Sequence, residues 1–346
     1  MIQRAGYYLL RMYVRAGLYF YFRKIIIHGQ ENIPSGPVIF AANHQNAFMD
    51  ALVIACFDAH FTHFLTRADI FKRSFIRWMI TSLNMIPVYR IRDGLQSLAE
   101  NQKTFDSCTR LFLKNEAVVI FPEGNHGSQR RLRPLTKGFA RMAFESLRNY
   151  PKLKISIVPV GINYSDHQAF RSSVSIYYGE PILANDYFHE PIQREATHLR
   201  DELAARMKRL TTHVEDADRY SEIIQKLEAS NPNYLDPADI NERISKIERG
   251  EGVTSPLRPT RNTQGLRPFY YIAVLINFIP LMIWQKIKMR IKDPVFVSSI
   301  RFGVGIFVFP FFYLLIALQV SAWYGPIIAL SWCVVSLPSA LFLRTK

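Results

Sequence analysis

The chain has 346 residues, which is enough for one large domain and an additional module. Its formal net charge of +15 favours an anionic partner, either nucleic acid or a membrane surface with acidic lipids. The absence of a recognition module and the long apolar stretches disfavour nucleic acid. The three cysteines have neither the pattern of a disulfide framework nor metal-ligand spacing.

Residues 1–22 predict an amphipathic helix. Arg4, Arg11 and Arg15 share one helical face, and apolar residues occupy the opposite face. The arginines interrupt the apolar core that a signal peptide needs. We therefore expect a helix in the membrane interface, with its arginines reaching lipid phosphates. The alternative is a helix packed on the core of the protein.

The apolar run 38–40 predicts a short buried strand that leads into Asn43 and His44. Asp50 follows six residues after His44, so a turn and the start of a helix could bring the two together. A carboxylate that keeps one ring nitrogen protonated leaves the other free to accept a proton, as a general base must. The alternative is that His44 caps the helix and Asp50 is a surface charge.

Residues 85–89 predict another strand, which runs into Arg90 and Arg92. In an extended chain these two side chains point the same way. Two adjacent guanidinium groups offer rigid forks of donors to a phosphate dianion. The alternative is a pair of solvated arginines at a strand edge.

The β-branched residues of 117–121 predict a strand, and Glu123 and Gly124 follow it. The carboxylate could accept a hydrogen bond from a substrate hydroxyl, and the glycine permits close backbone approach. Lys137 precedes the next predicted helix, whose first N–H groups could bind an anion. The strand expected over 155–164 contains Pro159, which predicts a sheet edge or a bulge.

The second half of the chain predicts a charged helical region over 186–247 and a basic linker over 249–268. Residues 269–346 predict a membrane module. The segments 302–320 and 322–343 carry no charge and are long enough to span a bilayer, with a turn at 321–326. The alternative is a buried helical pair in a soluble protein.

Basic residues flank this hairpin, with Arg301 at one end and Arg344 and Lys346 at the other. The positive-inside rule then predicts an integral membrane protein with its catalytic domain on the cytoplasmic side. The segment 269–285 has basic flanks on both sides, so we expect a re-entrant or interfacial segment that is kinked at Pro280.

Four segments, in this order, resemble the motifs of the glycerolipid acyltransferase family, which includes glycerol-3-phosphate and lysophosphatidic acid acyltransferases. They are Asn43-His44 with Asp50, which resembles the NHxxxxD motif, and residues 86–90, 121–124 and 157–161. The resemblance covers about half of the chain. It implies a mixed α/β sheet flanked by helices, within an acyltransferase domain over 23–248.

The resemblance also implies the roles of the site residues. His44 and Asp50 would be catalytic, and the substrate would be bound by Arg90, Arg92, Glu123, Gly124 and Lys137. Many members continue with Thr-Arg after the glycine, whereas this chain has Asn125-His126. One of three nearby arginines could replace the missing one: Arg130, Arg131 or Arg133.

The implied reaction transfers an acyl group from acyl-CoA or acyl carrier protein to lysophosphatidic acid. Glycerol 3-phosphate and a lyso-aminolipid are alternative acceptors, and the arginine pair favours the two phosphorylated ones. No metal or other cofactor is implied. A non-catalytic membrane lipid-binding protein is the alternative from another class, and a hydrolase is disfavoured because the chain has no G-x-S-x-G sequence.

Overall fold

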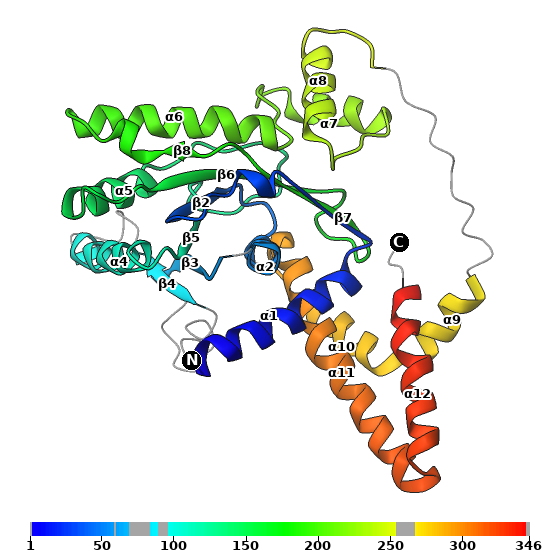
Figure 1. Ribbon diagram of the computed structural model, residues 1–346. Coiled ribbons are helices and arrows are strands. Elements are labelled where there is room, and N and C mark those ends of the chain that lie inside the picture. The colour runs from blue at the N-terminus through cyan, green and yellow to red at the C-terminus, as the bar shows by residue number, and fades with distance from the viewer. Residues whose placement is uncertain (1, 59, 69–83, 89–95, 254–266, 344–346) are drawn as a thin grey trace.

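The computed structural model describes residues 2–58, 60–68, 84–88, 96–253 and 267–343. They form an eight-stranded mixed sheet flanked by helices, with an N-terminal helix and a helical C-terminal region (Figure 1). The fold class predicted from the sequence is thereby confirmed. The strands are β1 Lys24–His28, β2 Val38–Ala42, β3 Thr62–Arg67, β4 Met85–Val88, β5 Ala117–Ile120, β6 Ser156–Tyr164, β7 Ser173–Tyr178 and β8 Ile182–Leu183.

The strand order is β1-β7-β6-β2-β5-β3-β4, with β8 also paired to β6. Neighbours are parallel except where β6 meets β7 and β8. Because β2 and β5 are adjacent and parallel, their carboxyl ends lie at the same edge of the sheet. That edge carries His44 after β2 and Glu123 after β5.

Two hydrophobic cores cover the two faces of the sheet. Along β2, Phe40 faces the core shared with α1 (Ile2–Tyr21) and α2 (Phe48–Phe57). Ile39 faces the other core, which is built from α4 (Gln96–Phe112), α5 (Gly138–Asn149) and α6 (Ile192–Leu210). This alternation is the two-residue period of a strand that is buried on both faces.

Strand β6 is internal, because β2 pairs with one side of it and β7 with the other. The edge position predicted from Pro159 is therefore wrong. The β6–β7 ladder ends where Val160 faces Tyr178, and Pro159 lies just beyond that point. The Pro159 carbonyl still accepts a hydrogen bond from the Gly179 N–H. Proline has no N–H to donate, but at this position the β6–β7 ladder has already ended.

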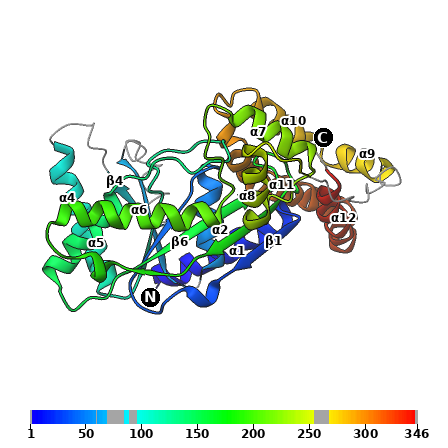
Figure 2. The ribbon, with the colours of Figure 1, turned by 90° about the horizontal axis from the view of Figure 1, so that it is seen from above.

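Helices α7 (Tyr220–Ala229) and α8 (Pro237–Glu248) have a small core of their own. Figure 2 shows them beyond one end of α6, which runs along the sheet. Tyr234, which lies between the two helices, packs its ring 3.3 Å from the Arg130 guanidinium. Of the helical region expected over 186–247, α6 therefore packs on the sheet, and the part with α7 and α8 contacts the loop that carries Arg130.

The C-terminal region comprises α9 (Arg267–Ile276), α10 (Phe278–Lys288), α11 (Val297–Tyr324) and α12 (Pro326–Ser339). A continuous helical segment, Pro294–Tyr324, has 31 residues and a mean hydropathy of 2.2. Within the described parts of the chain, it alone is long and apolar enough to cross a membrane, unless the bent pair α9–α10 counts as one more span. Gly325, inside the predicted turn, separates it from α12, which is shorter than the predicted span 322–343.

Helices α9 and α10 meet at an angle of 82°, and the break lies at Asn277 rather than at Pro280. Pro280 is in the first turn of α10, where a missing N–H costs no helical hydrogen bond. Asn277 is buried and donates from its amide to the Ala273 carbonyl and to Ser339 Oγ. Its side chain therefore stabilises the bend and ties it to the end of α12.

Candidate active site

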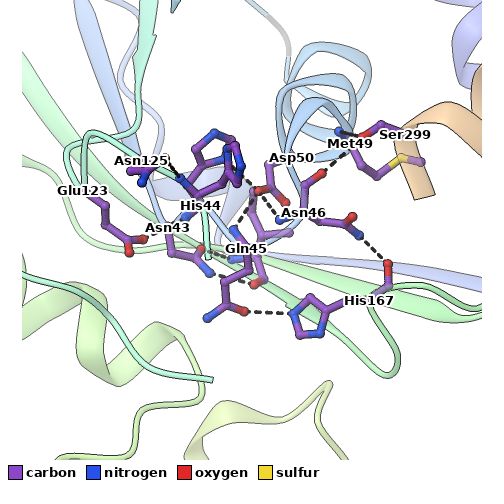
Figure 3. A network of polar contacts seen from close by, with 12 residues as sticks. Asn43, His44, Gln45, Asn46, Met49, Asp50, Glu123, Asn125, His167 and Ser299 are labelled. Carbon is purple, nitrogen blue, oxygen red and sulfur yellow. Dashed lines mark hydrogen bonds and ion pairs between the residues drawn. The ribbon is translucent and has the colours of Figure 1, made fainter. Parts of the chain in front are cut away.

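His44 and Asp50 lie together at the carboxyl end of β2 (Figure 3). The distance from His44 Nδ1 to Asp50 Oδ2 is 2.9 Å. The Asp50 side chain is fully buried, whereas that of His44 is 17% exposed. Among the residues that the structure describes, none forms a hydrogen bond with His44 Nε2. One ring nitrogen is therefore held by a carboxylate and the other is left for a substrate.

The Asp50 carboxylate is fixed by four hydrogen bonds. Oδ2 also accepts the backbone N–H groups of Gln45 and Asn46, and Oδ1 accepts the hydroxyl of Tyr164. Burial and the neighbouring Asp50 charge raise the pKa of Tyr164 well above its usual value, so this hydroxyl is a donor. Sequence analysis missed Tyr164, although it ends the predicted strand 155–164.

The spacing between His44 and Asp50 is one residue longer than in NHxxxxD, so the motif stated from the sequence was wrong in its spacing. Five residues, 45–49, separate His44 from Asp50. The turn they form includes Ala47, whose backbone has φ 42° and ψ −127° immediately before α2. A backbone of this left-handed kind is costly for alanine, so the longer spacing is accommodated with local strain.

Two aromatic side chains stand beside the His44 ring. Phe121 is stacked on it with centroids 4.0 Å apart, and His126 is perpendicular to it at 5.8 Å. Both follow β5, so the pairing of β2 with β5 supplies the contacts. They restrict the orientations available to the imidazole.

Glu123 joins the loop after β5 to the loop after β2. Its Oε1 accepts the His44 backbone N–H at 2.8 Å, and its Oε2 accepts Arg133 Nε at 2.7 Å. The side chain is only 1% exposed. Burial raises the pKa of this carboxyl, and the Arg133 charge and the His44 N–H oppose that rise. Both oxygens predicted to bind a substrate hydroxyl are thus engaged by the protein.

Two of the three arginines considered as replacements, Arg133 and Arg130, have different surroundings. Arg133 binds Glu123 and donates from Nη1 to the His126 carbonyl at 3.0 Å. Arg130 is buried and donates to the carbonyls of Tyr164 and Ser165. Arg133 is therefore the one that shapes the loop beside His44, whereas Arg130 supports the fold.

The other predicted substrate residues are placed as follows. Gly124 has φ 69°, a conformation that suits glycine, in the turn after Glu123. Lys137 immediately precedes α5 and donates to Thr197 Oγ1 on α6 at 2.5 Å. Arg90 and Arg92 lie outside the described residues.

The start of the apolar C-terminal helix also reaches this site, which sequence analysis did not anticipate. Ser299 Oγ accepts the Met49 N–H at 3.0 Å (Figure 3), and Asp293 Oδ2 lies 3.2 Å from His126 Nε2. No short-range sequence pattern connects these segments. The loops that hold His44 and Asp50 are therefore in direct contact with the C-terminal region.

The segment that carries His44, Asp50 and Glu123 is similar to known proteins. Residues 24–163 match the family model described as Acyltransferase. The chain is 34% identical over 91 residues to glycerol-3-phosphate O-acyltransferase 2 of Saccharomyces cerevisiae, which is 26% of this chain and 12% of that protein. It is 28% identical over 142 residues to the chloroplastic 1-acyl-sn-glycerol-3-phosphate acyltransferase BAT2 of Brassica napus, covering 40% of this chain and 39% of that protein.

The matches thus span well under half of the length of these relatives. Among solved structures, a 1-acyl-sn-glycerophosphate acyltransferase from Thermotoga maritima is similar, with a TM-score of 0.41 and 20% sequence identity. That match covers 60% of this chain and 84% of the other.

Proposed function

We propose that this chain, in which residues 24–163 match the family model described as Acyltransferase, transfers a fatty acyl group from a thioester to the free hydroxyl of lysophosphatidic acid. The observation that carries the proposal is the bond between His44 Nδ1 and the buried Asp50 carboxylate, with Nε2 left for a substrate. An acyl transfer to an alcohol needs a base in this arrangement.

The proposed reaction is a direct transfer. His44 Nε2 takes the proton of the acceptor hydroxyl while the oxygen of that hydroxyl attacks the thioester carbonyl carbon. The carbon–sulfur bond then breaks, and the imidazolium returns the proton to the leaving thiolate. Asp50 stabilises the imidazolium between these steps. General-base assistance of this kind contributes about 10²–10⁴-fold in rate.

A nucleophilic role for Cys56 or Cys108 is disfavoured by the burial of these two thiols. Burial raises the pKa of both Cys56 and Cys108 to about 12. The thiolate form, which is the nucleophile, is therefore scarce at neutral pH. An acyl-enzyme on either side chain is unfavourable, which supports direct attack by the acceptor.

The apolar surface supports a membrane location. The segment Pro294–Tyr324 is long enough to span a bilayer, and α1 exposes large apolar side chains, among them Leu9, Met12 and Phe20. We propose an integral protein with its catalytic domain on the cytoplasmic side of a bilayer containing anionic lipids. Acyl-CoA or acyl carrier protein would bring the acyl group to this surface.

Glycerol 3-phosphate is the second candidate acceptor. It is favoured by the similarity to two yeast proteins named glycerol-3-phosphate O-acyltransferases, at 34% and 32% identity. Both acceptors carry a phosphate, for which Arg90 and Arg92 are the proposed ligands. A non-catalytic lipid-binding protein would have no use for the complete His44–Asp50 pair.

The test uses the purified protein in detergent with a labelled acyl thioester, offering lysophosphatidic acid and glycerol 3-phosphate separately. We expect transfer to lysophosphatidic acid that falls at least about 10²-fold in His44→Ala. His189→Ala, at an exposed histidine, is the matched control and should leave the rate unchanged. Transfer to glycerol 3-phosphate alone would select the second candidate, and full activity in His44→Ala would contradict the mechanism.

A further inference from the structure

Two polar side chains that are far apart in the sequence meet next to His44. His126 belongs to the loop after β5, and Asp293 belongs to the segment between α10 and α11. His126 Nε2 and Asp293 Oδ2 are 3.2 Å apart, and the two side chains are 20% and 47% exposed. The pair is therefore at the surface of the site, where either residue can be replaced without opening the core.

Each partner is also fixed by its own surroundings. Asp293 Oδ1 accepts the Val295 N–H at 3.0 Å and so caps the helical turn that begins at Pro294. The His126 carbonyl accepts Arg133 Nη1, and its N–H donates to Asn125 Oδ1. The carboxylate thus has one oxygen for the helix and one for the histidine.

Contacts that do not involve His126 hold the first turns of α11 against the site. Ser298 Oγ donates to the His167 carbonyl at 2.5 Å, Ser299 Oγ accepts the Met49 N–H, and Arg301 donates to the Gln168 carbonyl at 2.9 Å. The position of Asp293 relative to His44 is therefore set independently. Asp293 can act as a fixed support for the His126 ring.

The His126 ring is confined between this support and the catalytic histidine. The Phe296 ring is at 4.9 Å and 81° to it, and the His44 ring is at 5.8 Å and 86°. If His126 were free to rotate, His44 would lose one of its two aromatic neighbours. Phe121 would then be the one described ring against the imidazole, and the Asp50 hydrogen bond would be the other restraint.

We propose that His126, held by Asp293, is a positioning residue that keeps His44 Nε2 directed at the acceptor hydroxyl. The inference rests on the proposed function. It assigns a role to the His126 side chain in the loop after β5. It also makes catalysis depend on the position of the apolar helix α11, because Asp293 caps the turn Pro294–Phe296 that leads into that helix.

The variants separate the pair from the helix cap. Asp293→Ser retains an oxygen that can cap the helix but is too short to reach His126. Asp293→Asn is the conservative rescue, since its oxygen can cap and its amide can pair with the imidazole. Asp236→Ser is the matched control, because Asp236 caps α8 before a proline in the same way and is bonded to Asp239 rather than to the site.

We expect His126→Ala and Asp293→Ser each to lower kcat about tenfold with KM within about twofold, since a small displacement of a catalytic group is costly. Asp293→Asn should stay within about threefold of the wild type, and Asp236→Ser should match it. The double variant His126→Ala/Asp293→Ser should be no slower than the worse single variant, because both remove the same interaction. Effects that multiply in the double variant, or that change KM alone, would overturn the proposal.

A readout that does not need turnover keeps this inference distinct from the proposed function. A wild type no more active than His44→Ala would refute the proposed acyl transfer. The NMR ring signals of 13C-labelled histidine, assigned with His44→Ala and His126→Ala, report the effect of the His126–Asp293 pair on His44. They do so whether or not the protein transfers acyl groups. Asp293→Ser should shift the His44 ring signal and Asp236→Ser should not. An unchanged His44 signal in Asp293→Ser would refute the positioning role.

Discussion

The hydroxyl of Tyr164 donates a 2.8 Å hydrogen bond to Asp50 Oδ1, the carboxylate oxygen that His44 does not contact. Tyr164 is fully buried at the end of β6. The carboxylate is thereby fixed at both oxygens, and the imidazole follows its orientation. Strand β6, the neighbour of β2, thus contributes to the orientation of the His44–Asp50 pair.

We expect Tyr164→Phe to lower kcat about three- to tenfold and to cost about 1–3 kcal/mol in the free energy of unfolding, because Asp50 Oδ1 loses its donor. Steady-state kinetics and thermal unfolding in detergent measure the two effects. Tyr178→Phe is the matched control, since Tyr178 is also buried but its hydroxyl has no hydrogen-bond partner among the described residues. Equal losses in the two variants would refute the special role of Tyr164.

Replacing Arg133 should loosen the loop beside His44. Arg133→Gln leaves the buried Glu123 carboxylate without its charged partner, and the expected cost is about 1–3 kcal/mol in the free energy of unfolding. Arg200→Gln removes an exposed pair with Asp201 and should cost less than about 1 kcal/mol. Chemical denaturation compares the two, and a cost for Arg133→Gln no greater than the control would contradict this view of Glu123.

In the strained turn before α2, we expect a substitution to raise the free energy of unfolding rather than lower it. Ala47→Gly should raise the free energy of unfolding by up to about 1 kcal/mol, because glycine adopts φ 42° without the steric cost of a Cβ atom. Activity should stay within about twofold. Ala51→Gly, inside the same helix, should instead lower stability by about 1 kcal/mol. Destabilisation by both variants would show that the turn is not strained.

Buried histidine makes stability depend on pH. Burial lowers the pKa of His167 to about 4, whereas an unperturbed histidine has a pKa of about 6.5. Between these values the unfolded chain binds more protons than the folded protein, so stability rises with pH by at most about 1.4 kcal/mol per unit. The lowered pKa of His213, also caused by burial, acts in the same direction.

The unfolding midpoint in detergent should therefore fall as the pH is lowered from about 6.5 to about 4. His167→Gln should reduce this slope, since glutamine does not titrate. His189→Gln should preserve it, because His189 is exposed. A slope unchanged by His167→Gln would show that other groups control the acid sensitivity.

The sequence was sufficient to predict features that depend on short-range geometry. His44 and Asp50 are joined by a strand end, a turn and a helix start, so their order in the chain nearly determines their contact. Tyr164 and Asp293 approach the site through long-range packing, of β6 beside β2 and of the start of the C-terminal helix on the loops that hold His44 and His126. No local pattern contains that information.

One error has a local physical cause. Proline was expected to kink the segment 269–285, but Pro280 is tolerated in a first helical turn, and the chain bends at the buried Asn277 instead. Glu123 was expected at the strand end, where it is found. Its partner Arg133 could not be selected from three nearby arginines until the loop geometry was known.

The position of β7 has a consequence for protein engineering. This strand lies outside the family segment 24–163, yet it is inserted between β1 and β6 and pairs with both. A chimera that exchanged only the family segment would leave the resident β7 between a foreign β1 and a foreign β6. It would also detach Arg130 from the Tyr234 ring. The smallest exchangeable cassette therefore extends through α8, well beyond the boundary that sequence similarity marks.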